Sequence, residues 1–268
     1  MVVRMPCNSH KKAKMSGQMH SPLRITLAWC VHAYTALGLP VSAVMAYLII
    51  VQPLDASFRW AFVMMLVATF VDCTDGPVAR AIRIREVLPG FDGRRLDDLV
   101  DWLTYTCLPL LLIWKAGLLG SFGGWWLIVP LMASAYGFCQ VSIKTDDGYF
   151  LGFPSLWNII AFYLYALQPM PASISLGLIL LLSVLTFVPL RYLYPNQPGL
   201  LNRLTILFGA AWCVLLGWIF AVMPNDNERS ESVKRLTIVS LIFPIYYFIS
   251  SWIITWRLWR TRVVRGEG

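Results

Sequence analysis

Residues 60–80 read WAFVMMLVATFVDCTDGPVAR, so an apolar run meets aspartates at positions 72 and 75. A membrane-spanning helix needs about 20 consecutive, mainly apolar residues, and this stretch has the required length. Carboxylates inside a spanning segment are expensive to bury and usually mark a functional position. The stretch therefore predicts a membrane helix that carries part of a functional site.

The composition extends this prediction to the whole chain. Of the 268 residues, 58% are hydrophobic and 13% are charged, and the mean hydropathy is +0.64. A soluble domain carries about 25% charged residues, which excludes a water-soluble fold. We expect an all-α, polytopic transmembrane helical bundle with about eight spans. Apolar runs place the spans near 27–51, 57–82, 95–116, 123–142, 155–168, 173–190, 204–222 and 236–256. The fifth run is short, so it either tilts or joins the sixth through the break at 168–171.

Basic residues predict how the bundle is oriented. With eight spans both termini lie on one side, and 17 lysines and arginines fall on that side against five on the other. The positive-inside rule then places both termini and the aspartates of 72–101 at the cytoplasmic face. We expect a basic cytoplasmic tail at 1–25, a transmembrane catalytic domain at 26–258 and a second basic cytoplasmic tail at 259–268. Residues 1–25 show no signal-peptide cleavage pattern. The basic tails suit an anionic lipid surface better than nucleic acid.

A second acidic segment, GRRLDDLVD at 93–101, follows the first. Asp72 with Asp75, and Asp97 with Asp101, stand at helical spacing, so each pair can share a helix face. Gly93 precedes Asp97 and Asp101 at steps of four, and the three form a stripe along one helix. Two acidic faces packed together would bind a hard divalent cation, which in turn binds phosphates.

Small and basic residues accompany these acids. Gly76 and Ala79 lie three residues apart on the carboxylate face, where small side chains let a pyrophosphate approach the backbone. Arg80, one turn beyond Gly76, is placed to bind a phosphate through its planar guanidinium. The alternative is structural: the arginines of 80–95 would form interfacial salt bridges with the aspartates.

The pattern DxxDGxxAR at 72–80, followed by GxxxDxxxD at 93–101, resembles the signature of the CDP-alcohol phosphotransferase family. The resemblance implies a six-helix membrane core and transfer of a nucleotide-activated group to an alcohol, with release of CMP. It also implies one or two divalent metals, with Asp101 both near the metal and taking the proton of the attacking hydroxyl. The implied metal positions are Asp72, Asp75, Asp97 and Asp101, and the implied CDP-diacylglycerol positions are Gly76, Ala79 and Arg80.

The chain departs from the family pattern in one respect. Twelve residues separate Arg80 from Gly93, where the family usually has eight. The excess is about one helical turn, so it nearly preserves the facing of the two motifs if it is helical. The Leu88-Pro89-Gly90 stretch instead favours a loop.

Further segments are similar to the bacterial phosphatidylcholine synthases of this family. They read SAYGFCQ at 134–140, KTDD at 144–147, FLGFPSLWN at 150–158 and LRYLYP at 190–195. This resemblance implies condensation of CDP-diacylglycerol with choline to give phosphatidylcholine and CMP, with Mn²⁺ or Mg²⁺, in a bacterial inner membrane. We also expect a homodimer as a partner state.

Choline recognition needs particular side chains, because a quaternary ammonium is bound by aromatic faces and a nearby carboxylate. The loop 143–158 offers such groups, and two spans expected to line the cavity add tyrosines. The choline-binding candidates are Tyr149, Trp157, Asp146, Tyr105 and Tyr136. Aromatic residues also gather at membrane interfaces without any ligand, so both interpretations stay open.

Two further polar residues belong to the candidate site. Arg191 either binds a phosphate of CDP-diacylglycerol or extends its charged end to the membrane interface. His32 either forms a hydrogen bond within the bundle or borders the nucleotide pocket.

Other functions fit parts of the pattern. A related CDP-alcohol phosphatidyltransferase would accept serine, inositol or glycerol phosphate, but a phosphate-bearing acceptor calls for an extra basic pocket. A divalent-cation transporter would distribute acids along a path through the membrane, whereas seven of the 14 acidic residues lie between positions 72 and 101. Intramembrane prenyl transfer usually has paired acidic motifs in two similar halves, and this chain has one acidic region.

Overall fold

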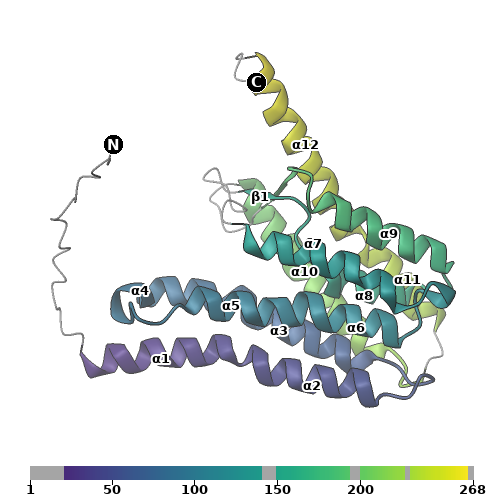
Figure 1. Cartoon of the computed structure of the whole chain (residues 1–268), viewed down its shortest axis with the longest axis horizontal. Coiled ribbons are helices and arrows are strands. Elements are labelled where there is room, and N and C mark those ends of the chain that lie inside the picture. The colour runs from purple at the N-terminus through teal and green to yellow at the C-terminus, as the bar shows by residue number, and fades with distance from the viewer. Residues whose placement is uncertain (1–20, 141–148, 194–199, 227–229, 265–268) are drawn as a thin grey trace, which may run out of the picture.

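The computed structural model describes residues 21–140, 149–193, 200–226 and 230–264, and these are almost entirely helical (Figure 1). The first elements are α1 (Pro22–Ala36), α2 (Gly38–Val51), α3 (Arg59–Ile82), α4 (Ile84–Val87), α5 (Gly93–Asp101), the π-helical turn η1 (Trp102–Cys107) and α6 (Leu108–Lys115). They are followed by the 3-10 turns η2 (Gly120–Phe122) and η3 (Gly124–Leu127), then α7 (Ile128–Cys139), β1 (Tyr149–Leu151), α8 (Trp157–Ala166) and α9 (Ala172–Leu185). The last are β2 (Arg191–Leu193), α10 (Leu200–Val222), α11 (Glu231–Ser240) and α12 (Ile242–Val264).

The helices confirm a membrane fold. Four segments are long and apolar enough to cross a bilayer: Pro22–Val51, Arg59–Ile82, Asn202–Val222 and Glu231–Arg260. Shorter apolar helices cover Gly124–Cys139, Trp157–Ala166 and Ala172–Leu185. Every range expected to span contains helix, the third as the continuous run of α5, η1 and α6. The chain is therefore an all-α, polytopic membrane protein, in which the fifth and sixth ranges form the separate helices α8 and α9.

Proline explains where the first helical rod is interrupted. Pro40 has no N–H to donate to the carbonyl of Ala36, and its ring crowds that carbonyl. Accordingly α1 ends at Ala36 and α2 begins at Gly38. Figure 1 shows the two helices end to end below α3 and α5. A Cβ on Gly38 would collide with Val100 of α5, so the missing side chain lets α2 and α5 approach closely.

The long gap between the two acidic motifs forms a short helix and a loop. α3 ends where Arg83 adopts a left-handed backbone conformation with φ 55°. In α4, Ile84 and Val87 are buried in a small apolar cluster with Ala28 and Val31 of α1. Residues 88–92 then form the loop predicted from Leu88-Pro89-Gly90. The extra residues thus anchor the connection to α1 and bring the chain back to the start of α5.

Aromatic packing ties the acidic helices to the rest of the bundle. Phe62 of α3, Phe162 of α8 and Phe220 of α10 contact one another with ring centroids 5.2–5.9 Å apart. All three side chains are buried in the main core. Such ring pairs add about 0.5–1.5 kcal/mol each beyond the burial of apolar area. α3 is therefore fixed on one side by this core and on the other by α1 and α2.

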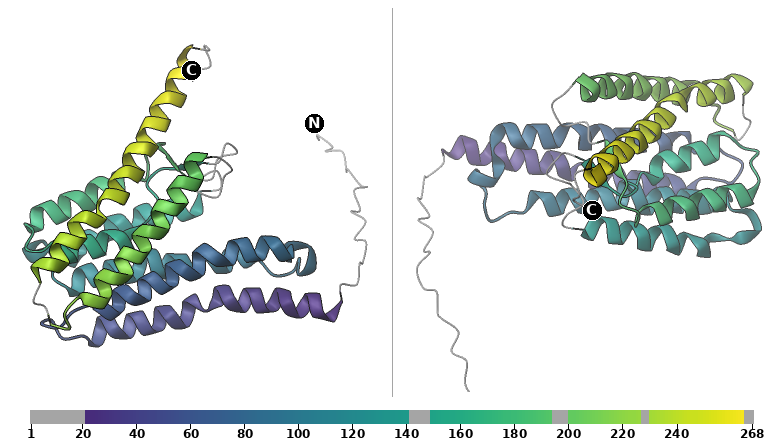
Figure 2. Two further views of the ribbon diagram at one scale, coloured as in Figure 1. Left: turned by 180° about the vertical axis from the view of Figure 1, so that it is seen from behind. Right: turned by 90° about the horizontal axis from the view of Figure 1, so that it is seen from above.

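A small antiparallel two-stranded sheet pairs β1, which follows α7, with β2, which follows α9. In this β1–β2 sheet Tyr149 lies opposite Leu193 and Leu151 opposite Arg191. The backbone N–H of Arg191 donates to the hydroxyl of Thr255 at 2.8 Å, and that hydroxyl donates to the Arg191 carbonyl at 3.2 Å. The β1–β2 sheet is thereby attached to α12. Figure 2 shows α12 crossing the outside of the bundle, with its C-terminal part projecting beyond the other helices.

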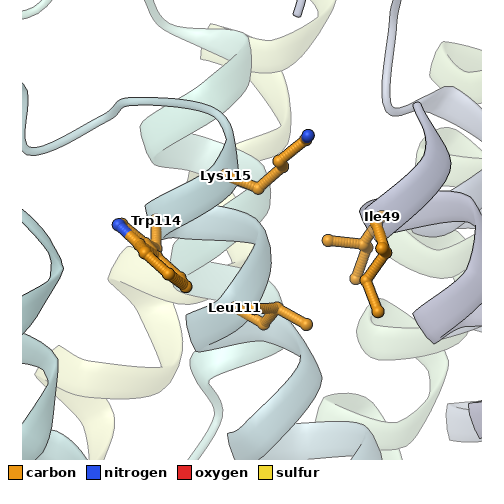
Figure 3. Close-up of a pocket in the computed structure, with 5 residues that line it drawn as sticks. Ile49, Leu111, Trp114 and Lys115 are labelled. Carbon is orange, nitrogen blue, oxygen red and sulfur yellow. The ribbon is translucent and has the colours of Figure 1, made fainter. Parts of the chain in front are cut away.

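A cavity of about 350 Å³ lies between α2 and α6 (Figure 3). It is lined by Ile49, Ile50, Leu111, Trp114 and Lys115. Figure 1 shows that the C-terminal ends of α2 and α6 lie away from α4 and the start of α5. Its lining is apolar apart from one lysine. This cavity therefore lacks the acidic groups that the sequence pattern singles out.

Candidate active site

The two acidic segments meet in the structure. α3 contacts η1, the continuation of α5, while α1 packs against both α3 and α5. One carboxylate oxygen from each of Asp72, Asp97 and Asp101 lies within 4.8 Å of the other two. All three residues are half-buried. This carboxylate triad confirms the expectation that two acidic helix faces converge.

The triad fits a divalent cation. Three carboxylates supply oxygen ligands of the kind that Mg²⁺ and Mn²⁺ prefer. Asp101 Oδ1 is buried and has no hydrogen-bond partner in the part of the chain that the structure describes. An unpaired buried polar atom is costly, and a coordinated cation would remove that cost. The geometry and the donor set therefore support metal binding by these three residues.

Asp75 differs from the other implied metal ligands. It is buried, with 5% of its surface exposed, but its carboxylate lies outside the triad. Three residues along an α-helix correspond to a rotation of about 300° and a rise of about 4.5 Å. Asp75 therefore points some 60° away from Asp72 and stands almost one turn further along α3. Its assignment as a direct ligand stays a prediction.

Tyr105 makes a contact that was not predicted from the sequence. It lies beside the triad, where its hydroxyl donates to Asp72 Oδ2 at 2.7 Å. Its assignment as a choline contact stays a prediction. Its side chain is buried. Tyr105 belongs to the π-helical turn η1, and such turns are frequent at functional sites. Pro109 was the available signal, because it cannot donate to the carbonyl four residues earlier, which is that of Tyr105.

The residues implied to seat the nucleotide lie on the last turns of α3. A guanidinium nitrogen of Arg80 lies 3.3 Å from the position that a Cβ on Gly76 would take. The Arg80 side chain therefore folds back along the face that Gly76 leaves open. Ala79 is half-buried and packs against the apolar cluster formed by α1 and α4. Gly76 and Arg80 thus form a surface beside the triad, while Ala79 also contributes to packing.

His32 packs directly on the second motif. A Cβ on Gly93 would collide with the His32 imidazole, so the absence of a side chain at Gly93 makes room for this ring. Phe91 covers the imidazole at a centroid distance of 4.4 Å, and Trp29 lies 5.2 Å from Phe91. His32 Nε2 is buried and has no hydrogen-bond partner among the described residues. Both interpretations of His32, a hydrogen bond within the bundle and a place beside the nucleotide pocket, stay predictions.

The choline candidates differ in how far their side chains are exposed. Trp157 is fully buried, and its indole N–H donates to Ser134 Oγ at 2.7 Å. Trp157 therefore exposes no ring face to a ligand in this conformation, and its assignment as a choline contact stays a prediction. Tyr136 is 45% exposed and packs against Phe187 at 4.8 Å. Asp146 lies outside the described residues.

Tyr149 and Arg191 lie close together on the β1–β2 sheet. The Arg191 guanidinium carbon lies 5.7 Å from the centre of the Tyr149 ring, which is within the range of a cation–π contact. Both side chains are half-buried. The arrangement fits either interpretation of Arg191, because a guanidinium on an aromatic face at a membrane interface can still bind a phosphate.

Comparison with known proteins decides the family. No family model matches the chain. The phosphatidylcholine synthase of Pseudomonas aeruginosa is 30% identical over 242 residues, which cover 90% of this chain and 94% of that protein. The Legionella pneumophila enzyme of that name is 35% identical over 237 residues, covering 82% and 88%. That of Agrobacterium fabrum is 34% identical over 194 residues, covering 71% and 78%. The chain belongs to the phosphatidylcholine synthase family.

Membership in the phosphatidylcholine synthase family confirms the resemblance drawn from the acidic motifs and from segments further along the chain. The similarity extends over 90% of this chain in one relative and 82% in another, so it is not confined to the acidic motifs. It also decides against a cation transporter, for which the triad alone would have been compatible.

Proposed function

We propose that this protein synthesises phosphatidylcholine by condensing CDP-diacylglycerol with choline and releasing CMP. The observation that carries the proposal is the carboxylate triad, with oxygens within 4.8 Å of one another, in a chain of the phosphatidylcholine synthase family. With a divalent cation bound, such a site suits a substrate that carries a pyrophosphate. The cation supplies the positive charge that offsets the pyrophosphate, which the aspartates themselves cannot do.

The roles of the residues follow from their positions. Asp72, Asp97 and Asp101 would hold one or two divalent ions. When bound, such an ion supplies charge neutralisation and orientation of the phosphates. Asp101 accepts the proton of the choline hydroxyl while the choline oxygen forms a bond to the β-phosphorus of CDP-diacylglycerol. The bond from that phosphorus to the bridging oxygen breaks, and the electron pair leaves with CMP. Arg80, above Gly76, binds the departing nucleotide phosphate.

The location of the protein is part of the proposal. The two acidic motifs and the loops that carry β1 and β2 belong to the side on which most lysines and arginines of the sequence fall, and the positive-inside rule would assign this side to the cytoplasm of a bacterial cell with the protein in its inner membrane. Both termini lie on the same side, as basic tails at 1–25 and 259–268 that flank the catalytic domain at 26–258. The substrates CDP-diacylglycerol and choline would meet at this surface, and the assembly would be a homodimer.

For choline recognition we retain the residues whose side chains are accessible. Tyr149 and Tyr136 have exposed aromatic surface, and Asp146 would supply a carboxylate for the quaternary ammonium. Arg191, next to Tyr149, would bind a phosphate of CDP-diacylglycerol. The Arg191 positive charge beside Tyr149 opposes a choline cation on the same face of that ring, so the two ligands would use different faces.

The test is turnover by the purified protein in lipid nanodiscs. Labelled CDP-diacylglycerol is supplied with choline, serine, inositol or glycerol 3-phosphate, each with Mn²⁺, with Mg²⁺ or with EDTA. We expect phosphatidylcholine and CMP from choline alone, with Mn²⁺ or Mg²⁺ required. A product from another alcohol, and none from choline, would instead assign a sister activity. Metal flux into sealed liposomes without any CMP release would reinstate the transporter.

A further inference from the structure

We propose that Tyr105 is a positioning residue, whose hydroxyl fixes the orientation of the Asp72 carboxylate for metal binding. The inference deepens the proposed function and rests on its metal triad. It concerns a residue that neither acidic motif contains. Its basis is a direct contact between the two helices that carry the triad.

The contact joins the helices at a defined atom. Tyr105 lies four residues after Asp101 on the same helical rod, and it reaches across to α3, where it donates to Asp72 Oδ2 at 2.7 Å. This distance is within the range of about 2.5–2.7 Å of charge-assisted hydroxyl–carboxylate hydrogen bonds. Because the tyrosine ring is 8% exposed, water does not compete readily for the bond. The Asp72 side chain therefore has one oxygen held in place from outside the triad.

The bond to one Asp72 oxygen also restricts the orientation of the other. A carboxylate on a free side chain rotates about two bonds, and ordering it costs part of the binding free energy of a ligand. A donor that fixes one oxygen also fixes the direction of the second. Groups that orient metal ligands in this way typically change metal affinity about 10–100-fold when they are removed. Asp72 is the only member of the triad on α3, so its orientation decides whether the two helices act on one ion.

Tyr105 lies where three helical segments meet. The turn η1 that carries it contacts both α3 and α8, and α8 also contacts α3. Asn158, in the first turn of α8, donates through Nδ2 at 3.4 Å to the hydroxyl of Thr69, which lies three residues before Asp72 on α3. This packing around the tyrosine restricts the movement of its ring.

The π-helical turn explains how Tyr105 comes to face α3. Pro109 leaves the Tyr105 carbonyl without its α-helical partner, which favours the wider i→i+5 pattern of η1 over residues 102–107. The turn directly follows Asp101, so the triad residue and the positioning residue stand at the junction of two helix types. A local irregularity beside a cluster of functional side chains is the usual setting of such turns.

The experiment compares Mn²⁺ binding by two tyrosine variants, without lipid substrate or turnover. Tyr105→Phe keeps the ring and removes the hydroxyl. The matched control is Tyr163→Phe, a second buried tyrosine, whose hydroxyl contacts Ser240 at 3.0 Å and Trp212 Nε1 at 3.1 Å far from the triad in sequence. Binding is measured on purified protein by electron paramagnetic resonance of free Mn²⁺, and thermal unfolding is recorded without metal.

We expect Tyr105→Phe to weaken Mn²⁺ binding about 10–100-fold, while Tyr163→Phe leaves it unchanged and both variants unfold at similar temperatures. Equal Mn²⁺ affinity in Tyr105→Phe and the wild type would overturn the positioning role but leave the triad intact. Equal losses in both tyrosine variants would also overturn it, because the effect would then be a general loss of stability. Absence of Mn²⁺ binding in the wild type would overturn the triad itself, and with it the proposed function.

Discussion

The acidic region around α3 and α5 and the aromatic region around β1 and α8 were both predicted to be functional from sequence, but the structure bears on them differently. The three aspartates of the triad meet in space. Among the choline candidates, Trp157 is a core residue, Tyr105 contacts the triad and Asp146 lies outside the described residues, so the choline site stays a prediction. The difference lies in what each pattern measures. Aspartates in an apolar chain are costly and therefore informative one by one, whereas an aromatic side chain is equally at home in a core, at an interface or in a binding site.

The comparison depends most strongly on Asp101. Asp101→Asn keeps the size of the side chain but removes the proton acceptor, so CMP release should fall about 10²–10⁴-fold. At saturating Mn²⁺, CDP-diacylglycerol should still bind, because Asp72 and Asp97 remain as ligands and Arg80 and Gly76 are untouched. The measurement is release of labelled CMP together with liponucleotide binding to the same preparation. Turnover close to that of the wild type would remove Asp101 from its role.

In the aromatic region the largest expected effect is on stability. Trp157→Ala would open a cavity in the core and should destabilise the protein by about 3–5 kcal/mol. Trp157→Phe would lose the bond to Ser134 and part of the ring volume, at about 1–2 kcal/mol. Thermal unfolding in detergent measures both, with the exposed Tyr136→Ala as the matched aromatic control. The milder variant should retain the choline KM of the wild type. A raised choline KM in Trp157→Phe, with unfolding unchanged, would restore Trp157 to the choline site.

Two isosteric changes on α3 test which of its aspartates is a direct metal ligand. Asp72→Asn removes a ligand and should weaken Mn²⁺ binding more than loss of an orienting group does, by about 100-fold or more. Asp75→Asn should have a smaller effect, because its carboxylate lies outside the triad. Titration with Mn²⁺ gives both affinities, and EDTA should abolish turnover reversibly. If the two variants lost affinity equally, Asp75 would be a direct ligand and the triad would have a fourth member.

The smallest effect concerns the contact between Gly93 and His32. Gly93→Ala forces the imidazole to move and should cost about 1–3 kcal/mol of stability. Gly90→Ala is the control, since a Cβ there meets nothing within 4 Å. Combining Gly93→Ala with His32→Ala should recover part of the loss, so the two changes would be less than additive. Thermal unfolding of the four variants measures this, and strictly additive losses would show that the ring and the glycine are not coupled.

These cases show what could be predicted from the sequence and why. Helix positions followed from apolar runs, and the convergence of Asp97 and Asp101 with Asp72 followed from spacing along helices. The motif alone could not predict that Asp72 belongs to the triad and Asp75 does not. That distinction depends on which face of α3 points toward α5. The bond from Tyr105 depends on a π-helical turn, which regular helical periodicity does not represent.

Burial was the other quantity that spacing did not reveal. Trp157 stands next to a polar loop in sequence, yet it points into the core formed by α8 and its neighbours. The twelve-residue gap between the motifs was also ambiguous, since it combines the short helix α4 with the predicted loop. In both cases the outcome depended on contacts with distant segments, here α7 for Trp157 and α1 for α4.

The π-helical turn has a consequence for how the third rod can vary. Each residue of an α-helix advances the direction of the next by about 100°, so one residue added within a turn resets the phase of everything after it. In η1 this reset falls between the acids of α5 and the apolar residues of α6. Removing one residue between 102 and 107 would rotate α6 relative to α5 about the helix axis and leave the directions of Asp97 and Asp101 as they are. The π-helical turn therefore separates the helical phase of α5, which carries the acids, from that of the apolar α6.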